Sequence, residues 1–227
     1  MNKVIRIFKI PDLRKKILIV LFWLIVFRLL AAIPIPGIDP LKLNEFFSSN
    51  QLFGFLNIFS GGGLANLSVM MLGVGPYITA TIIMQLLTII FPNLKKAYYE
   101  EGAEGRAKFN RLSRYLTVPL AAVNAYGFLN LFIAQKILDP LPMAAMLGNV
   151  VVITAGSVFL MWIGELISEY KIGNGISLII FAGIVSGLPQ VVTQSFLTYT
   201  PDVLLTYIVF MLVALLVLVG VVFICEG

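Results

Sequence analysis

The chain has 227 residues, of which 59% are hydrophobic and only 12% are charged. Soluble domains are closer to half apolar and a quarter charged, so this composition indicates an integral membrane protein. The sequence has no histidine and a single cysteine, which excludes histidine-dependent catalysis, histidine metal sites and an internal disulfide. The net charge of +5 follows a topology rule and is not a sign of nucleic-acid binding.

Residues 1–16 form a basic amphipathic segment that we expect to lie at the cytoplasmic membrane surface. An apolar run follows at 17–33 and ends where Pro34 and Gly37 interrupt helical structure. The run is long and lacks a small-residue cleavage site, so we expect it to be retained as the first transmembrane helix. Arg28, in its outer half, either extends to the interface or makes an internal contact, and the sequence favours neither.

A broken element follows between Gly61 and Pro76. It consists of three glycines, a short apolar piece from Leu64 to Leu72, and a second break at 73–76. Spanning a bilayer core takes about 20 apolar residues, so this piece is too short to cross. Irregular backbone at membrane depth is tolerated only inside protein or beside a water-filled cavity. The sequence therefore predicts a re-entrant element next to a cavity.

Five further apolar runs complete an expected set of six transmembrane helices. They lie at 76–91, 112–134, 147–167, 176–192 and 203–224. The segments expected on the side of the N-terminus are 1–16, 93–114 and 168–175, with six, six and one Lys or Arg, or 13 of the 16. Positive charge accumulates in cytoplasmic loops, so we expect a cytoplasmic N-terminus and a broken element that enters from outside.

Polar side chains form a row on the second span. Thr81, Gln85 and Thr88 are spaced by four and three residues and therefore share a face. Either hydrogen bonding between helices or a path or gate explains this row, and the spacing leaves both open. Glu165 and Glu169 are one turn apart, but they lie at a charged helix exit, which is more simply a solvated end. No catalytic set is visible, so we expect no enzymatic activity, no metal and no cofactor.

Two isoleucine pairs recur at four-residue spacing, which places each pair on one helix face. They are Ile78 with Ile82 and Ile180 with Ile184. On spacing alone each pair is ordinary core packing, because isoleucine pairs occur in most apolar helices.

Several motifs taken together resemble the SecY/Sec61-alpha family, whose members are the pore subunits of the Sec protein translocase. They occur at 33–39 (IPIPGID), 59–63 (FSGGG), 72–88 (LGVGPYITATIIMQLLT), 101–106 (EGAEGR), 162–165 (WIGE), 172–177 (IGNGIS) and 181–189 (FAGIVSGLP). The resemblance covers essentially the whole chain, with the motifs in the order of the family.

The resemblance implies roles for particular positions. The plug that closes the channel from outside would comprise Leu64, Ala65, Asn66, Leu67, Ser68, Val69, Met70, Met71 and Leu72. The apolar pore ring would comprise Ile78, Ile82, Ile180 and Ile184. Aliphatic side chains can seal around a passing chain without binding any one sequence. Gln85 and Thr88 would belong to the lateral gate, where apolar helices leave for lipid.

The fold implied is an all-α integral membrane protein with six transmembrane helices plus a short re-entrant plug helix. This would be the N-terminal half of a ten-helix inverted-repeat channel. The expected parts are a basic segment at 1–16, a five-helix half at 17–192 with the plug at 64–72, and an external loop with the sixth helix at 193–227. The family's remaining four helices have no counterpart, so we expect this chain to be an N-terminal fragment.

The function implied is a passive conduit for secretory proteins with lateral release of membrane-protein helices into lipid. The implied partners are the small membrane subunits SecE and SecG, the motor ATPase SecA, the ribosome, secretory polypeptides with signal sequences, and the bilayer of the inner (plasma) membrane. The alternative is a secondary transporter with a broken helix at its substrate site. Transporters usually place ionisable groups near the midplane, and the spans carry none there, which favours the channel.

Overall fold

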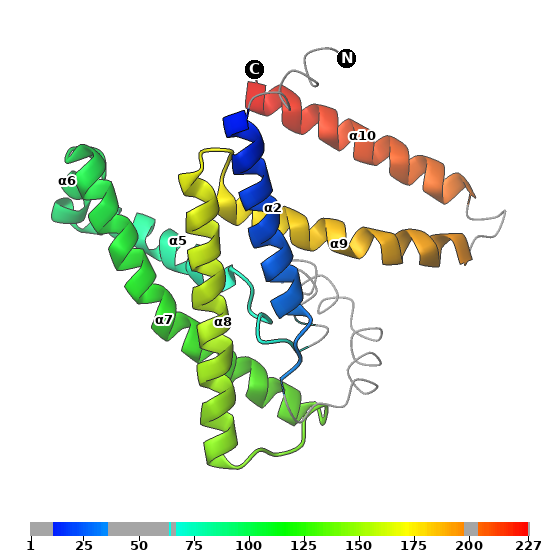
Figure 1. Ribbon diagram of the computed structural model, residues 1–227, viewed down its shortest axis with the longest axis horizontal. Helices are drawn as coiled ribbons and strands as arrows, with labels where there is room; N and C mark the ends of the chain where they lie inside the picture. Colours follow the sequence, from blue (N-terminus) through cyan, green and yellow to red (C-terminus); the bar gives the residue numbers. More distant parts are fainter. Residues whose placement is uncertain (1–10, 36–63, 65–66, 198–203, 227) are drawn as a thin grey trace. The chain divides into compact units, whose positions relative to one another are not determined.

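The computed structural model describes residues 11–35, 64, 67–197 and 204–226 (Figure 1). The first ten residues of the basic segment, the glycines at 61–63, and Ala65 and Asn66 of the expected plug lie outside the described residues. The helices are α2 (Pro11–Ala31), α5 (Gly75–Ile90), α6 (Pro92–Tyr99), α7 (Gly102–Ala134), α8 (Met143–Glu169), α9 (Gly175–Leu197) and α10 (Leu204–Glu226).

Helices occupy all six segments in which the sequence predicts a span, and the all-α prediction is confirmed over the described residues. By length and apolar composition, the described helices long enough to cross a membrane are α7, α8 and residues 207–224 of α10. A fourth span results if α5 and α6, which meet at a bend of 114°, are counted together. The count of six spans stays a prediction, because α2 carries several basic residues and the apolar part of α9 is short.

Proline sets both ends of α5. The helix begins at Gly75 with Pro76 in its first turn, where the missing proline donor breaks no intrahelical hydrogen bond. It ends before Phe91, whose backbone is extended (φ −106°, ψ 108°) because the next residue is Pro92. The chain then turns sharply into α6, so the proline that stops one helix starts the next.

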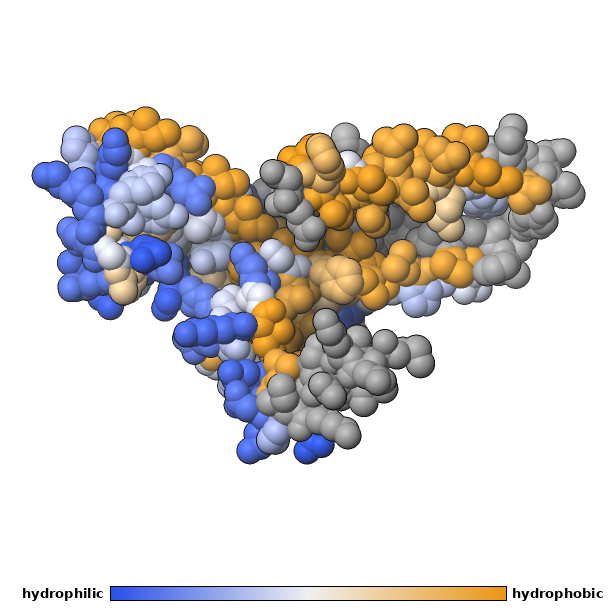
Figure 2. Space-filling view, turned by 90° about the horizontal axis from the view of Figure 1, so that it is seen from above, coloured by the Kyte–Doolittle hydropathy of each residue, from blue (hydrophilic) through white to orange (hydrophobic). Residues whose placement is uncertain are grey.

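The charged segment at 93–114 is a helical hairpin and not an extended loop. It consists of α6 and the first third of α7, which pack closely at Gly105. A Cβ atom at Gly105 would overlap the carbonyl oxygen of Ala97, so only glycine permits this approach. Figure 2 shows polar residues gathered at the α6–α7 end of the molecule, on the left of the view.

The stretch expected as a short plug helix is a series of turns over its described residues. Its backbone hydrogen bonds run three residues back, from Met71 N to Ser68 O (2.9 Å) and from Gly73 N to Met70 O (2.9 Å). Left-handed backbone at Leu67 (φ 38°) and Gly73 (φ 57°) prevents an α-helix from extending through either end. The helix expected here is therefore corrected to a turn-rich segment, which comprises Leu64 and residues 67–74.

This turn-rich segment is buried between helices within residues 1–187, which form one compact unit. Leu64, Leu67 and Met71 pack in an apolar cluster with α7 and α8. Met70 and Val74 pack in a second cluster with α2, α8 and the beginning of α9. The segment therefore presents apolar side chains to two clusters, which accounts for its burial despite irregular backbone.

Residues 188–227 form a second compact unit. The expected division at 193 is not tested by this boundary and stays a prediction. Within this unit α10 is apolar on all sides, and Phe210 and Phe223 are both more than 70% exposed. A helix that is apolar all round suits lipid or other membrane helices.

Candidate functional site

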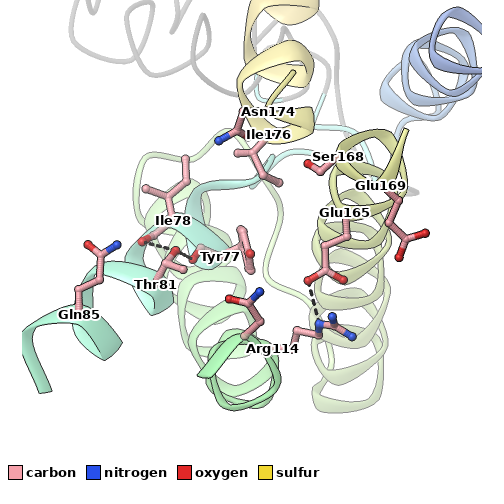
Figure 3. Close-up of a pocket in the computed structure, with 11 residues that line it drawn as sticks. Tyr77, Ile78, Thr81, Gln85, Arg114, Glu165, Ser168, Glu169, Asn174 and Ile176 are labelled. Atoms are coloured by element: carbon pink, nitrogen blue, oxygen red, sulfur yellow. Dashed lines mark hydrogen bonds and ion pairs between the residues drawn. The ribbon is translucent and has the colours of Figure 1, made fainter. Parts of the chain in front are cut away.

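A large cavity of about 570 Å³ is lined by α5, α7, α8 and the beginning of α9 (Figure 3). From α5 come Tyr77, Ile78, Thr81 and Gln85, and from α9 comes Ile176. The remaining lining residues are polar, and we call them the polar wall: Asn110, Arg114, Glu165, Ser168, Glu169 and Asn174. One wall is therefore largely contributed by a single helix, while the other carries most of the charge.

An ion pair joins α7 to α8 in the polar wall. Arg114 Nε donates a hydrogen bond of 2.7 Å to Glu165 Oε1, and the Glu165 side chain is 20% exposed. The sequence interpretation of Glu165 as a solvated helix end missed this partner. The available signal was one opposite charge at the adjoining ends of two consecutive spans. In the part of the chain that the structure describes, no three acidic, histidine or cysteine side chains are grouped as metal ligands.

Side-chain caps fix the turn between α8 and α9. Asn174 Oδ1 accepts hydrogen bonds from the backbone N–H groups of Ile176 (3.0 Å) and Ser177 (3.3 Å), as an N-cap does. Ser168 Oγ accepts another from Gly175 N at 2.9 Å. These bonds hold the first turn of α9 against α8 and so place Ile176 in the cavity wall.

A small cavity of about 230 Å³ lies beside the turn-rich segment. Leu64, Met71 and Leu72 line it from that segment, and α7 and α9 contribute further walls, including Ile180. Ile78 lines this cavity and the large one as well. A single half-buried isoleucine therefore lines both a polar-walled space and an apolar one, and the turn-rich segment lies next to a cavity as the sequence predicts.

Two of the four predicted ring residues come together. Ile78 and Ile180 both line the small cavity. Ile82 is 50% exposed and Ile184 is 41% exposed, and neither lines the two cavities described above. The four-residue ring stays a prediction.

The three polar residues in the row on α5 have different surroundings in the structure. Gln85 lines the large cavity, whereas Thr88 is only 5% exposed and donates to the Gln85 carbonyl oxygen at 2.6 Å. The Thr81 hydroxyl likewise bonds to the backbone of its own helix, at the Tyr77 oxygen. Hydroxyls satisfied within α5 do not bridge to a neighbouring helix. The lateral-gate roles of Gln85 and Thr88 stay predictions.

Backbone pairing ties the turn-rich segment to the residues that follow α2. Ile35 N donates to Leu67 O at 3.0 Å, and Val69 N donates to Ile33 O at 3.1 Å. These bonds enclose an antiparallel bridge between Pro34 and Ser68. Ile35 and Leu67 are 3% and 1% exposed, so the bond between them satisfies two backbone groups that solvent hardly reaches.

A family model described as SecY matches residues 68–227. Proteins named protein translocase subunit SecY are similar over most of the chain. That of Pyropia yezoensis is 45% identical over 82% of this chain and 44% of its own length. That of Bacillus licheniformis is 40% identical over 96% of this chain and 53% of its own length, and that of Synechocystis is 41% identical over 95% and 49%. The chain thus spans about half the length of these relatives.

Two solved structures share the fold. They are described as Sec61 in the canine ribosome–channel complex from the endoplasmic reticulum and as a protein-conducting channel. Each matches with a TM-score of 0.51 and 25% identity, over 74% of this chain and 35% of the solved chain. The likeness therefore extends from the sequence to the arrangement of helices.

Proposed function

This chain belongs to the SecY family, and we propose that it forms the N-terminal part of a protein-conducting channel. Secretory polypeptides would cross the membrane through it, and apolar helices would leave sideways into lipid. The family and the apolar helices make it a multi-pass membrane protein. Because the chain spans about half of its relatives, the complete channel would need further helices to close around the cavities.

The position of Ile78 carries this proposal. Its side chain lines both the polar-walled large cavity and the apolar small cavity. A narrow apolar constriction between two wider spaces opposes ion flow, because a hydrated ion would have to shed water there. A flexible aliphatic side chain can still move aside for a polypeptide without binding a particular sequence.

The remaining roles follow the same scheme. Leu64–Leu72 would act as a plug, which is supported by the burial of most of its described residues and by the place of Leu64, Met71 and Leu72 beside the small cavity. Ile82, Ile180 and Ile184 would complete the ring with Ile78. Gln85 and Thr88 would lie on the lateral-gate side of α5.

The proposed setting is the inner (plasma) membrane with a cytoplasmic N-terminus. The basic hairpin of α6 and α7 supports this orientation, because positive charge accumulates on the cytoplasmic side. Partners would be the small subunits SecE and SecG, the motor ATPase SecA and the ribosome. The large cavity, whose polar wall includes Arg114 near that hairpin, would then open toward the cytoplasm.

The test is an ion-leak measurement on the complete protein in sealed vesicles. The double variant Ile78→Gly with Ile82→Gly is expected to raise resting ion leakage, because it removes Ile78 from the wall shared by the two cavities and Ile82 from the proposed ring. The control is Leu86→Gly with Ile90→Gly, which places two glycines at the same spacing on exposed positions that line neither cavity. Leakage that stays at the level of the control would refute the ring assignment.

A further inference from the structure

Helix α8 meets the turn-rich segment at a glycine. Gly156 is buried, and a Cβ atom built on it would overlap the carbonyl oxygen of Val69 and crowd the Val69 side chain. The obstacle is backbone, which cannot rotate away as the end of a flexible side chain can. Glycine at 156 is therefore what allows α8 to touch the backbone of the segment.

The next residue makes a hydrogen bond at the same contact. Ser157 Oγ donates to the Gly73 carbonyl oxygen at 3.1 Å, and Ser157 is only 1% exposed. Other serine and threonine hydroxyl donors in the described helices bond to carbonyls three or four residues earlier in their own helix. Thr154, one turn before Ser157 on α8, does so with Val150 O at 2.7 Å. Within the described helices, Ser157 is thus the serine or threonine hydroxyl that donates to a carbonyl outside its own helix.

The receiving carbonyl is one that needs such a donor. Gly73 has left-handed backbone (φ 57°) and lies buried where the turns end and α5 is about to begin. A buried carbonyl without a partner loses the hydrogen bonds that water would give it. Ser157 supplies one at the point where the chain reverses into the helix that carries Ile78.

The segment is held from its other side as well. The backbone bonds of Leu67 and Val69 to the residues that follow α2 fix one edge, while Gly156 and Ser157 fix the face toward α8. Residues between Val69 and Gly73 are therefore held by two separate parts of the chain. Tightly packed segments of this kind occupy one discrete position and do not deform gradually.

We propose that Gly156 and Ser157 are positioning residues that form a seat on α8 for residues 69–73. The seat determines where the turn-rich segment rests beside the small cavity, and this consequence for closure depends on the channel function proposed above. Gly156 provides the close approach, and Ser157 provides the directional hydrogen bond. Neither residue belongs to the ring or to the plug itself.

The first measurement is backbone hydrogen exchange of the complete protein in detergent or vesicles, read at the amides of Met71 and Gly73. Both amides donate within the seated segment. Ser157→Ala is expected to speed their exchange about fivefold, the effect of losing one buried hydrogen bond on local opening. Gly156→Ala is expected to speed it at least as much. Ser157→Cys, which keeps a weak donor, is expected to recover part of the protection.

Two matched controls lie on the same helix. Gly148→Ala adds a methyl group where no neighbouring atom lies within 4 Å of the new Cβ. Thr154→Val removes a hydroxyl that bonds only within α8 in this structure. Both controls are expected to leave exchange at Met71 and Gly73 unchanged. Unchanged exchange in both seat variants, or an equal rise in the controls, would overturn the seat.

Ion leakage of the same variants separates this proposal from the channel function. Faster exchange together with higher leakage supports both. Faster exchange with background leakage keeps the seat and contradicts the closing role of the segment. If exchange in the seat variants stays at the wild-type rate while the Ile78→Gly, Ile82→Gly variant leaks ions, the seat is overturned and the channel function is retained.

Discussion

The two cavities that Ile78 lines are built by different forces. Apolar packing and backbone hydrogen bonds shape the small cavity, because the turn-rich segment that lines it is buried between two clusters. Side-chain electrostatics shape the polar wall of the large cavity, through the Arg114–Glu165 pair and the cap at Asn174. The small cavity therefore depends on the fit of atoms, whereas the polar wall of the large cavity depends on charge and hydrogen bonding.

Shortening a packed side chain of the small cavity is expected to have the largest effect on stability. Met71 is 1% exposed, so Met71→Ala should lower the free energy of unfolding by about 2 to 5 kcal/mol through lost burial and the cavity left behind. Thermal unfolding in detergent measures this loss. Met143→Ala is the control, because Met143 is 77% exposed and its loss should stay within about 0.5 kcal/mol. Equal effects of the two changes would refute the packing account.

Removing one charge from the polar wall of the large cavity is expected to have an intermediate effect on stability. Glu165→Gln should cost about 1 to 2 kcal/mol, because the pair is partly buried but Arg114 retains access to water. The loss is expected to persist at about 1 M salt, since partly buried pairs are screened less than exposed ones. Asp12→Asn is the control, because its pair with Lys16 is exposed and should contribute under about 0.5 kcal/mol.

A cycle with Arg114→Gln sharpens this prediction. If the two residues act through their mutual ion pair, the double variant should lose less stability than the sum of the single variants. Additive losses, or a loss from Glu165→Gln that vanishes in high salt like that of Asp12→Asn, would show that the wall does not depend on this pair.

The smallest effect on stability is expected from substitutions in the polar row of α5. Thr88→Val should change stability by less than about 0.5 kcal/mol and leave protein transport unchanged, because the hydroxyl bonds within its own helix. Gln85→Leu changes the wall of the large cavity and is expected to alter signal-sequence-dependent transport into vesicles. Equal impairment by both substitutions would show that Thr88 takes part in the gate directly.

Local signals in the sequence predict the helices well. Pro76 and Pro92 mark the ends of α5, and the apolar runs locate α2, α7, α8, α9 and α10. The break around Gly73 and the neighbouring cavity also follow from local reasoning, because glycine and a short apolar piece cannot make a span. These features depend on residues that are close together in the chain.

Contacts between residues that are far apart in the chain cannot be predicted from such local signals. Nothing near Gly156 indicates that Val69 lies against it, and the opposite charges at the adjoining helix ends do not single out Arg114 as the partner of Glu165, because each pair is formed only once the helices pack. The apolar piece after Gly63 resembles a helix in composition, yet pairing of its backbone with Ile33 and Ile35 stabilises turns instead. Tertiary packing thus overrides local preference at the segment most closely tied to the candidate site.

The position of Ile78 has a consequence for energy conservation in the membrane. Protons move by hopping along unbroken chains of hydrogen-bonded water, and they need no opening wide enough for a hydrated ion. Both cavities are large enough for several water molecules, and Ile78 lines each of them. In the channel proposed above, Ile78 would be the aliphatic side chain that interrupts such a water wire. A resting membrane that contains this channel would then keep its proton gradient because no continuous chain of water passes this side chain.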